Sequence, residues 1–448
     1  MTNAKKNGNN DLRIAINVTE EWQKLGDGEL VQGCIIVSNQ FKEEHPEQFE
    51  AFIEEYKASA AFVVANPKDA SLLIEKHGIV PIIATDMFFR PFAPGYYTDT
   101  GEVPQEVIDR VPPMYRIMYW DYYNCEKSEQ SVAKFHHMIQ QHKRFHNPIM
   151  FLGGAWKWMG FAPNNAFSLY SSNFHLNCCL QHGIDDISLA TFGDDGSEAS
   201  MFSNLPTLVL YAEKLYKNTT EKVDIEEAFM DLFGLPVEAF LTLDCPNQIP
   251  DGPRMEDSSS ANPCKYFLYN DPLNGRLTRL VKHSYKPHFA ECEKRLAVWQ
   301  EDPQFGYIFE TLSALCRVLK NLATLPLELR EAYAAGDKAQ LEKLADSIPG
   351  IVADLDHFTD TFQTQWLKEN KLFGLETLEL RFGGQRGRLV STEKLLRLYL
   401  DGKLDRIEPL ETPLLYPNGK DANEPDREVN SYAEYLYDNT LPAGVPHC

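Results

Sequence analysis

Long hydrophobic runs are absent from this chain of 448 residues. No stretch approaches the ~18 apolar residues that an α-helix needs to cross a bilayer. The N-terminal sequence MTNAKKNGNNDLR carries positive charge but lacks the apolar core of a secretory signal. We therefore expect a soluble protein of the cytoplasm that has no membrane span.

Cysteines at the spacings typical of disulfide frameworks or zinc sites are also missing. The chain has 9 cysteines, an odd number, and no two of them have the CxxC spacing. This pattern suits neither a disulfide framework nor a zinc knuckle, so we expect reduced thiols.

Positive charge is scarce, because 43 Lys and Arg face 65 Asp and Glu and the formal net charge is -22. Proteins that bind nucleic acids generally rely on clustered Lys and Arg, so nucleic acid is not an expected partner. A hydrophobic content of 43% with 12% aromatic residues excludes wholesale disorder. The length allows two or three domains, each with its own core.

The chain begins with a small expected unit at residues 12–80, after an N-terminal segment, 1–11, that we expect to be disordered. Strands are predicted at 12–17 (LRIAIN) and 33–38 (GCIIVS). The helix predicted over Phe41 to Lys57 has aromatic residues at helical spacing, and a second helix is predicted to end at Gly78.

Strands and helices then alternate from residue 81 to about 250. Four apolar segments predict strands: Pro81 to Asp86, Tyr115 to Asp121, Pro148 to Gly153, and Ile187 to Gly193. This alternation is typical of a β/α barrel or a doubly wound sheet. Residues 285–400 are helical in pattern with short connections, which predicts an antiparallel bundle.

Polar and aromatic side chains follow each of these four strands, where barrel enzymes keep their catalytic groups. They are Asp86; Tyr119, Trp120, Asp121 and Tyr122; Trp156 and Trp158; and Asp194 and Glu198. Rings that stack on a sugar face and carboxylates that accept hydrogen bonds from hydroxyls would suit a saccharide site. Core packing of the aromatic residues and a solvated turn at the acidic segment are the structural alternatives.

Four histidines lie close together in the sequence, at His136, His137, His142 and His146. Their mixed helical spacing and the absence of ordered carboxylate partners argue against a metal site. We expect neither a metal nor a cofactor.

Several motifs occur in a fixed order: IIATDMFFR, YWDYYN, GGAWKWMGFAPNNAFS, FGDDGSEAS, NPCKYFLYNDP and FGLETLELRFGGQRGRL. Over residues 81–412 they resemble the later part of glycoside hydrolase family 20, the exo-β-N-acetylhexosaminidases. The resemblance implies the second half of an incomplete (β/α)8 TIM-type barrel at 81–280. It also implies a helical C-terminal domain at 281–412, followed by an irregular tail at 413–448.

The resemblance also implies roles for single residues. The family uses the 2-acetamido group of the substrate as nucleophile, and Tyr119 would hold its carbonyl with Asp121 close beside it. The expected sugar-binding residues are Asp86, Trp120, Tyr122, Trp156, Trp158, Asp194 and Glu198. Ala84 stands where the family has a tryptophan, which weakens one wall of the expected pocket.

The family's catalytic Asp-Glu pair is missing, because no Asp-Glu dipeptide occurs in the sequence. That pair orients the acetamido group and protonates the leaving oxygen. We therefore expect a hexosaminidase-like glycosidase that is weak or inactive. The alternatives are a non-catalytic binder of carbohydrate or of a small solute, and a non-functional fusion product.

Residues 12–80 resemble a different family through the motif GCIIVSNQFKEEHPE. The motif is similar to part of the second lobe of solute-binding proteins of ABC transporters. Joined at residue 81, the two resemblances predict a fusion of two partial sequences. Half a barrel would expose its edge strands, so a homodimer or other oligomer is an expected partner, beside an N-acetylhexosamine-containing glycan.

Overall fold

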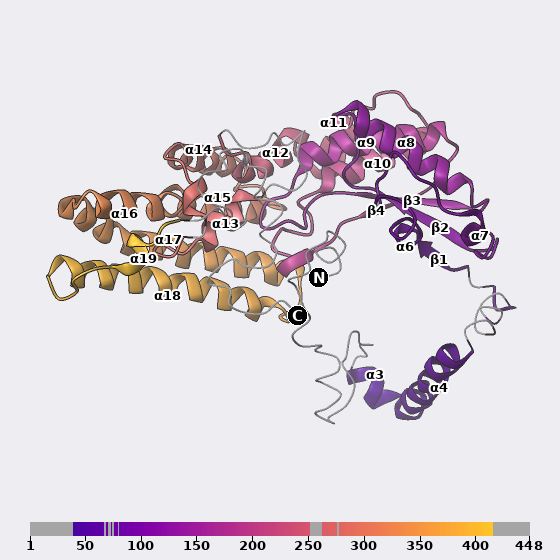
Figure 1. The fold of residues 1–448 in the computed structure, drawn as a ribbon, viewed down its shortest axis with the longest axis horizontal. Coiled ribbons are helices and arrows are strands. Elements are labelled where there is room, and N and C mark those ends of the chain that lie inside the picture. The colour runs from indigo at the N-terminus through magenta and orange to yellow at the C-terminus, as the bar shows by residue number, and fades with distance from the viewer. Residues whose placement is uncertain are drawn as a thin grey trace. The chain divides into compact units, whose positions relative to one another are not determined.

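The computed structural model of the chain describes residues 39–66, 69, 73, 76–78, 80–250, 262–275 and 277–414. The chain divides into two compact units, residues 1–80 and 81–448, and each is described by itself. Figure 1 gives the order of the elements along the chain.

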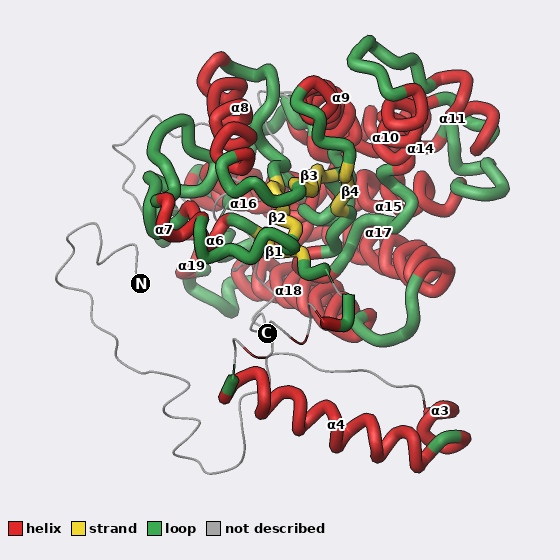
Figure 2. Tube along the Cα trace, turned by 90° about the vertical axis from the view of Figure 1, so that its right-hand side faces the viewer, coloured by secondary structure: helices red, strands yellow, loops and turns green. Residues whose placement is uncertain are grey.

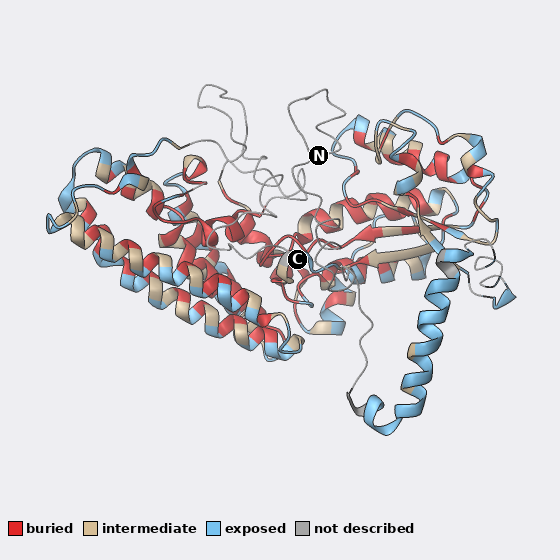
Figure 3. Cartoon of the chain, turned by 60° about the horizontal axis from the view of Figure 1, so that its bottom comes forward, coloured by how far each residue is buried: buried red, intermediate tan, exposed pale blue. Residues whose placement is uncertain are grey.

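The first unit contains two described helices, α3 (Asn39–Glu44) and α4 (Pro46–Ala65). Proline at the first helical position and an acidic residue in the first turn both favour the start of α4. The helix predicted in this region is therefore present. Its expected apolar face is not buried, since Phe52 and Tyr56 are 48% and 51% exposed, and Figure 3 draws most of α4 as exposed. The two predicted strands lie outside the described residues.

The second unit is built on a four-stranded sheet with the order β1-β2-β3-β4, and every neighbouring pair is parallel. The strands are β1 (Ile82–Ala84), β2 (Arg116–Trp120), β3 (Ile149–Gly154) and β4 (Asp186–Ala190). Each strand overlaps one of the four predicted segments. The α/β class and the number of strands in this region are confirmed.

Helices α8 (Glu129–Lys143), α9 (Asn165–Gln181) and α10 (Leu205–Lys217) lie on one face of the sheet in both Figure 1 and Figure 2. Strand residues Tyr119 and Phe151 point into this layer and are fully buried. Their rings contact Phe135 of α8 at centroid distances of 5.3 and 5.7 Å. Right-handed crossovers between strands in sequential order place all crossover helices on one side.

The opposite face of the sheet is only half-buried. Met118, Met150 and Leu152 alternate with the buried residues along β2 and β3 and keep part of their surface exposed. Parallel sheets are usually covered on both faces, so this face is unusual for an open sheet.

Two glycines at the end of β3 allow close packing. A Cβ atom on Gly153 would overlap the hydroxyl of Tyr211, a buried residue of α10. A Cβ atom on Gly154 would lie 2.8 Å from atoms of both Trp158 and Tyr122. Glycine is needed at both positions because neighbouring side chains fill the space of a Cβ.

The described part of the chain after the sheet is mainly helical, as predicted. Its longer helices are α14 (Tyr285–Ala297), α15 (Gly306–Leu322), α16 (Leu325–Ala334), α17 (Lys338–Glu369) and α18 (Leu375–Leu400). Shorter helices of the second unit are α6 (Asp86–Phe89), α7 (Gln105–Ile108), α11 (Glu226–Phe233), α12 (Val237–Leu241), α13 (Pro263–Tyr269) and α19 (Glu408–Glu411). No helix in the described part of the chain is both long and apolar enough to cross a membrane.

The sheet and the helical part are joined by a helix cap. Asp244 lies in the 3₁₀ helix η2 (Thr242–Asn247) and is fully buried. Its two carboxylate oxygens each accept a backbone N–H at 2.8 Å, from Asn165 and from Ala166. These groups are among the unpaired donors at the start of α9, so Asp244 stabilises that helix from outside it.

Candidate functional site

Aromatic side chains gather where the strands end, because the carboxyl ends of parallel strands meet at one edge of the sheet. We call this edge the rim. Along it the ring centroids of Tyr96 and Trp120 are 4.7 Å apart, those of Trp120 and Tyr122 5.3 Å, and those of Tyr122 and Trp158 5.5 Å. The rim is therefore a continuous layer of aromatic rings, in which Tyr96 and Trp120 are partly exposed and Tyr122 and Trp158 are buried.

Asp86 supplies a carboxylate to the rim. One oxygen accepts a hydrogen bond from the indole Nε1 of Trp120 at 3.4 Å, and the other lies 3.0 Å from Nε of Arg90. The Asp86 side chain is 24% exposed, so a ligand can reach it. Among the predicted site residues, Asp86 and Trp120 contact each other, and both side chains are partly exposed to solvent.

Tyr119 and Asp121 are both fully buried below the rim. The Tyr119 hydroxyl donates to Asp121 Oδ2 at 2.7 Å, and the backbone N–H groups of Tyr123 and Asn124 donate to Oδ1 at 2.9 and 3.0 Å. Burial, with the Asp121 charge beside it, raises the pKa of Tyr119 well above its usual value. The polar groups of this pair stabilise the turn after β2, and their role toward an acetamido group stays a prediction.

The two tryptophans after β3 are also buried, with Trp156 1% and Trp158 4% exposed. Their ring centroids are 4.4 Å apart, and Trp156 Nε1 donates to the carbonyl oxygen of Tyr122 at 3.1 Å. They support the rim from beneath, and Phe192, which is 44% exposed, covers Trp158 at 5.7 Å.

Glu198 faces the helical part. Its carboxylate lies 2.8 Å from Nζ of Lys265 in α13 and 3.4 Å from a guanidinium nitrogen of Arg381 in α18, and it accepts a hydrogen bond from Tyr269 at 3.3 Å. The Glu198 side chain has no exposed surface. Asp194 lies in the 3₁₀ helix η1 (Asp194–Gly196) and is exposed. The structure thus separates the two carboxylates that the resemblance groups with the sugar.

Three aromatic residues of the rim were not predicted from the sequence: Tyr96, Tyr97 and Phe192. Tyr96 and Tyr97 follow a Pro-Gly pair, and Phe192 lies two residues after the end of β4, but aromatic residues in loops have no periodicity that would mark them. Tyr97 has a φ of 56°, which is unusual for a residue other than glycine. Its ring contacts Trp120 at 5.2 Å.

The structure gives His142 a role in the core. Its Nε2 lies 2.6 Å from Thr85 Oγ1, and its Nδ1 lies 2.6 Å from the carbonyl oxygen of Met138. Burial lowers the pKa of His142 to about 4. Among the described residues, no group of three or more His, Cys, Asp or Glu side chains could hold a metal ion.

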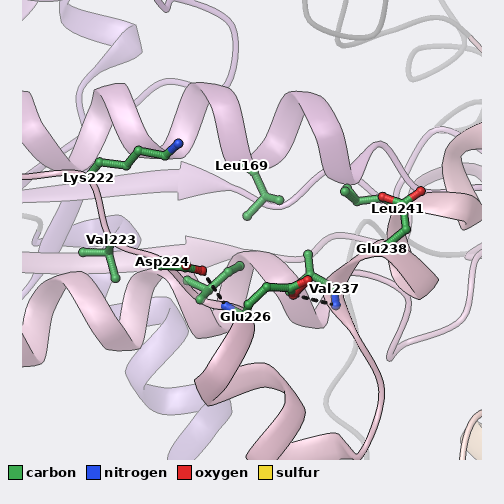
Figure 4. A pocket seen from close by; sticks show the side chains of 9 residues that line it. Leu169, Lys222, Val223, Asp224, Glu226, Val237, Glu238 and Leu241 are labelled. Atoms are coloured by element: carbon green, nitrogen blue, oxygen red, sulfur yellow. Dashed lines mark hydrogen bonds between the residues drawn. The ribbon is translucent and has the colours of Figure 1, made fainter.

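A cavity of about 490 Å³ is lined by residues of α9, of α12 and of the segment 222–226 (Figure 4). Leu169 of α9 and Val237 of α12 contribute apolar surface to it. Asp224 and Glu226 also line it, but each accepts a backbone N–H at 3.0 Å, from Glu226 and Val237 respectively. Because these carboxylates cap backbone groups, the cavity is a weaker candidate for a catalytic site than the rim.

The fold defines an α/β protein whose parallel sheet runs in sequential order and is followed by a helical domain. Residues 238–430 match the family model of the Glycoside Hydrolase 20C C-terminal domain. The chain therefore carries a domain related to glycoside hydrolase family 20. No curated protein matches the chain. The comparisons give no support to a solute-binding-protein relationship for residues 12–80.

Proposed function

We propose that this protein is β-N-acetylhexosaminidase-like and binds a terminal N-acetylhexosamine at the rim, with weak or absent hydrolysis. The observation that carries the proposal is the match of residues 238–430 to a C-terminal domain of glycoside hydrolase family 20. The domain name points to glycosidases, and the rim lies in the same compact unit as that domain.

The sheet supports the finer part of the proposal, in which it is the second half of a (β/α)8 barrel. Barrels require sequential parallel strands with helices on one face, whereas doubly wound sheets reverse their strand order and carry helices on both faces. The order β1-β2-β3-β4 and the half-buried second face agree with the barrel.

The rim offers the chemistry of sugar binding. Trp120 and its partly exposed neighbour Tyr96 present ring surface to the apolar face of a pyranose. The Asp86 carboxylate beside them can accept hydrogen bonds from sugar hydroxyls. Binding at this place needs neither Tyr119 nor Asp121 to leave its buried partner.

Weak hydrolysis follows from the sequence. General acid catalysis contributes roughly 10² to 10⁴-fold, and no Asp-Glu pair is present to supply it. Asp121 is held by Tyr119 and by backbone N–H groups, so it is not placed to protonate a leaving oxygen.

Titration calorimetry with N-acetylglucosamine, beside hydrolysis of 4-nitrophenyl N-acetyl-β-glucosaminide, tests both parts. We expect measurable binding heat, a hydrolysis rate near background, and an affinity loss of about fivefold for Trp120→Ala, since one stacked ring contributes on the order of 1 kcal/mol. Tyr216→Ala is the matched control, because Tyr216 is 93% exposed and does not belong to the rim.

Each part can fail separately. Absence of heat at high sugar concentration, or equal affinity of Trp120→Ala and wild type, would contradict binding at the rim. Rapid release of nitrophenol that survives repurification would contradict weak hydrolysis and would require another residue to act as the acid.

A further inference from the structure

Three thiols meet inside the helical domain, far along the chain from the rim segments. Cys292 of α14 is 2% exposed, and Cys245 of η2 and Cys316 of α15 are buried as deeply. The Cys292 sulfur contacts the backbone of Cys245, and hydrogen bonds with the thiols of Cys245 and Cys316 lower the pKa of Cys292. We call these three residues the thiol cluster. All three are free cysteines in the structure.

Cys292 is the central member of the cluster. Its Sγ lies 3.3 Å from the carbonyl oxygen of Cys245 and 3.5 Å from Nε2 of His288, one helical turn earlier in α14. Because His288 is only half-buried, the cluster lies one side chain below the surface. A small oxidant would therefore approach Cys292 past the His288 imidazole.

Disulfide formation requires a second thiol close to the first, and α14 packs against both elements that carry the other two cysteines, η2 and α15. Each neighbour comes from a different element, and α14 and α15 pack against one another along their length. Buried cysteines that serve only to fill a core need no thiol neighbour, since apolar contacts are enough.

We propose that the thiol cluster is an oxidation site at which hydroperoxides convert Cys292 and one neighbouring thiol into a disulfide. The Cys292 thiolate attacks one peroxide oxygen, the O–O bond breaks, and Cys292 becomes a sulfenic acid as hydroxide leaves. The sulfur of Cys245 or Cys316 then attacks the Cys292 sulfur and displaces water. In total, two thiols and one hydrogen peroxide give one disulfide and two waters.

The position of Cys245 gives the reaction a structural consequence. Asp244, the preceding residue, caps α9 by accepting the N–H groups of Asn165 and Ala166. A bond from Cys245 to Cys292 would fix η2 to α14 and with it the position of this cap. The inference does not depend on sugar binding, because the cluster lies outside the rim.

The experiment exposes the full chain to hydrogen peroxide, alkylates the remaining thiols, and maps the peptides by mass spectrometry. We expect a cross-linked peptide pair that contains Cys292 and has lost two hydrogens, and we expect dithiothreitol to restore the thiols. His288→Ala should slow the reaction severalfold, because it removes the neighbouring base.

The decisive variant is Cys292→Ser, which should abolish the cross-link. Cys292→Ala replaces it if the serine variant is misfolded by circular dichroism, and Cys245→Ser with Cys316→Ser removes both partners while keeping Cys292. Cys179→Ser is the matched control, since Cys179 is equally buried in α9 and lies outside the cluster. Absence of a disulfide in wild type, or a disulfide that persists without Cys292, would overturn the proposal.

Discussion

His142 shows how one side chain can respond to pH from inside the core. Both ring nitrogens face oxygen atoms, and the ring lies between Phe89 and Tyr119 at centroid distances of 5.1 and 4.7 Å. With its proton on Nδ1, the neutral ring donates to the Met138 carbonyl, and its Nε2 faces the Thr85 hydroxyl, which also donates to the Met118 carbonyl oxygen. A second proton would place an unpaired charge in an apolar layer.

This environment predicts a loss of stability in acid. The pKa of His142 is about 4 in the folded protein and 6.5 as its ordinary value, so the unfolded chain takes up its proton first. The contribution of His142 to the free energy of unfolding is fully present above pH 6.5 and falls by about 3 kcal/mol as the pH drops to about 4. His142→Gln should remove this part of the pH dependence of the free energy of unfolding, measured in urea. His77→Gln, at an exposed position, should leave it unchanged, and equal slopes for both variants would contradict the assignment.

At the scale of elements, the strands were predictable because apolar segments of five to seven residues end at Asp or Gly. The face of the sheet toward which each side chain points was not predictable. Tyr119 and Trp120 are adjacent, so they must point to opposite faces, but alternation alone does not tell which face the helices cover. The helices cover the face of Tyr119, and a predicted site residue thus lies in the core while Trp120 stays accessible.

The site was less predictable than the strands for a related reason. Glu198 follows β4 closely in the sequence, but Lys265 and Arg381, which hold it, lie much further along the chain. Contacts at such separation leave no local pattern. The resemblance to a family placed Glu198 near the sugar, whereas packing against the helical domain decides its environment here.

Asp244 predicts a second pH effect, of opposite sign, at the N-terminus of α9. Burial raises the pKa of Asp244 from 3.8 to about 7, and the hydrogen bonds from Ala166 and Asn165 only partly oppose this. The folded state therefore holds this proton more tightly, so the contribution to stability is complete below pH 4 and is lost as the pH rises through 7.

Asp244→Asn should remove that decline, because asparagine does not titrate. At low pH the variant should be less stable by about 1 kcal/mol, since one amide oxygen replaces two acceptors of the α9 cap. Urea unfolding between pH 4.5 and 8 measures both changes. If the difference between variant and wild type is the same at every pH, Asp244 does not titrate in this range.

At the scale of the whole second unit, the ion cluster around Glu198 connects the sheet to the helical domain. Lys265 and Arg381 have side chains that are only 2% and 5% exposed, and both of these buried cations contact the Glu198 carboxylate. Removing one partner of a buried ion pair leaves a charge without compensation, which is strongly destabilising.

Glu198→Ala should therefore lower the free energy of unfolding by about 3 to 5 kcal/mol. Glu331→Ala is the control, because its pair with His283 is exposed and such pairs contribute at most about 1 kcal/mol. Urea unfolding followed by tryptophan fluorescence compares the two. Equal losses for both variants would mean that the cluster does not hold the two parts together.

Helix α17 extends this connection across the helical domain. It has 32 residues, which corresponds to about 48 Å of rise. Its last residue, Glu369, accepts hydrogen bonds from Ser200 and from the backbone N–H of Met201, both at 2.5 Å, in the loop that carries Glu198. The loop after β4 is therefore anchored at the end of a long helix, so its position is set by the packing of α17 against α15 and α18 as well as by the sheet.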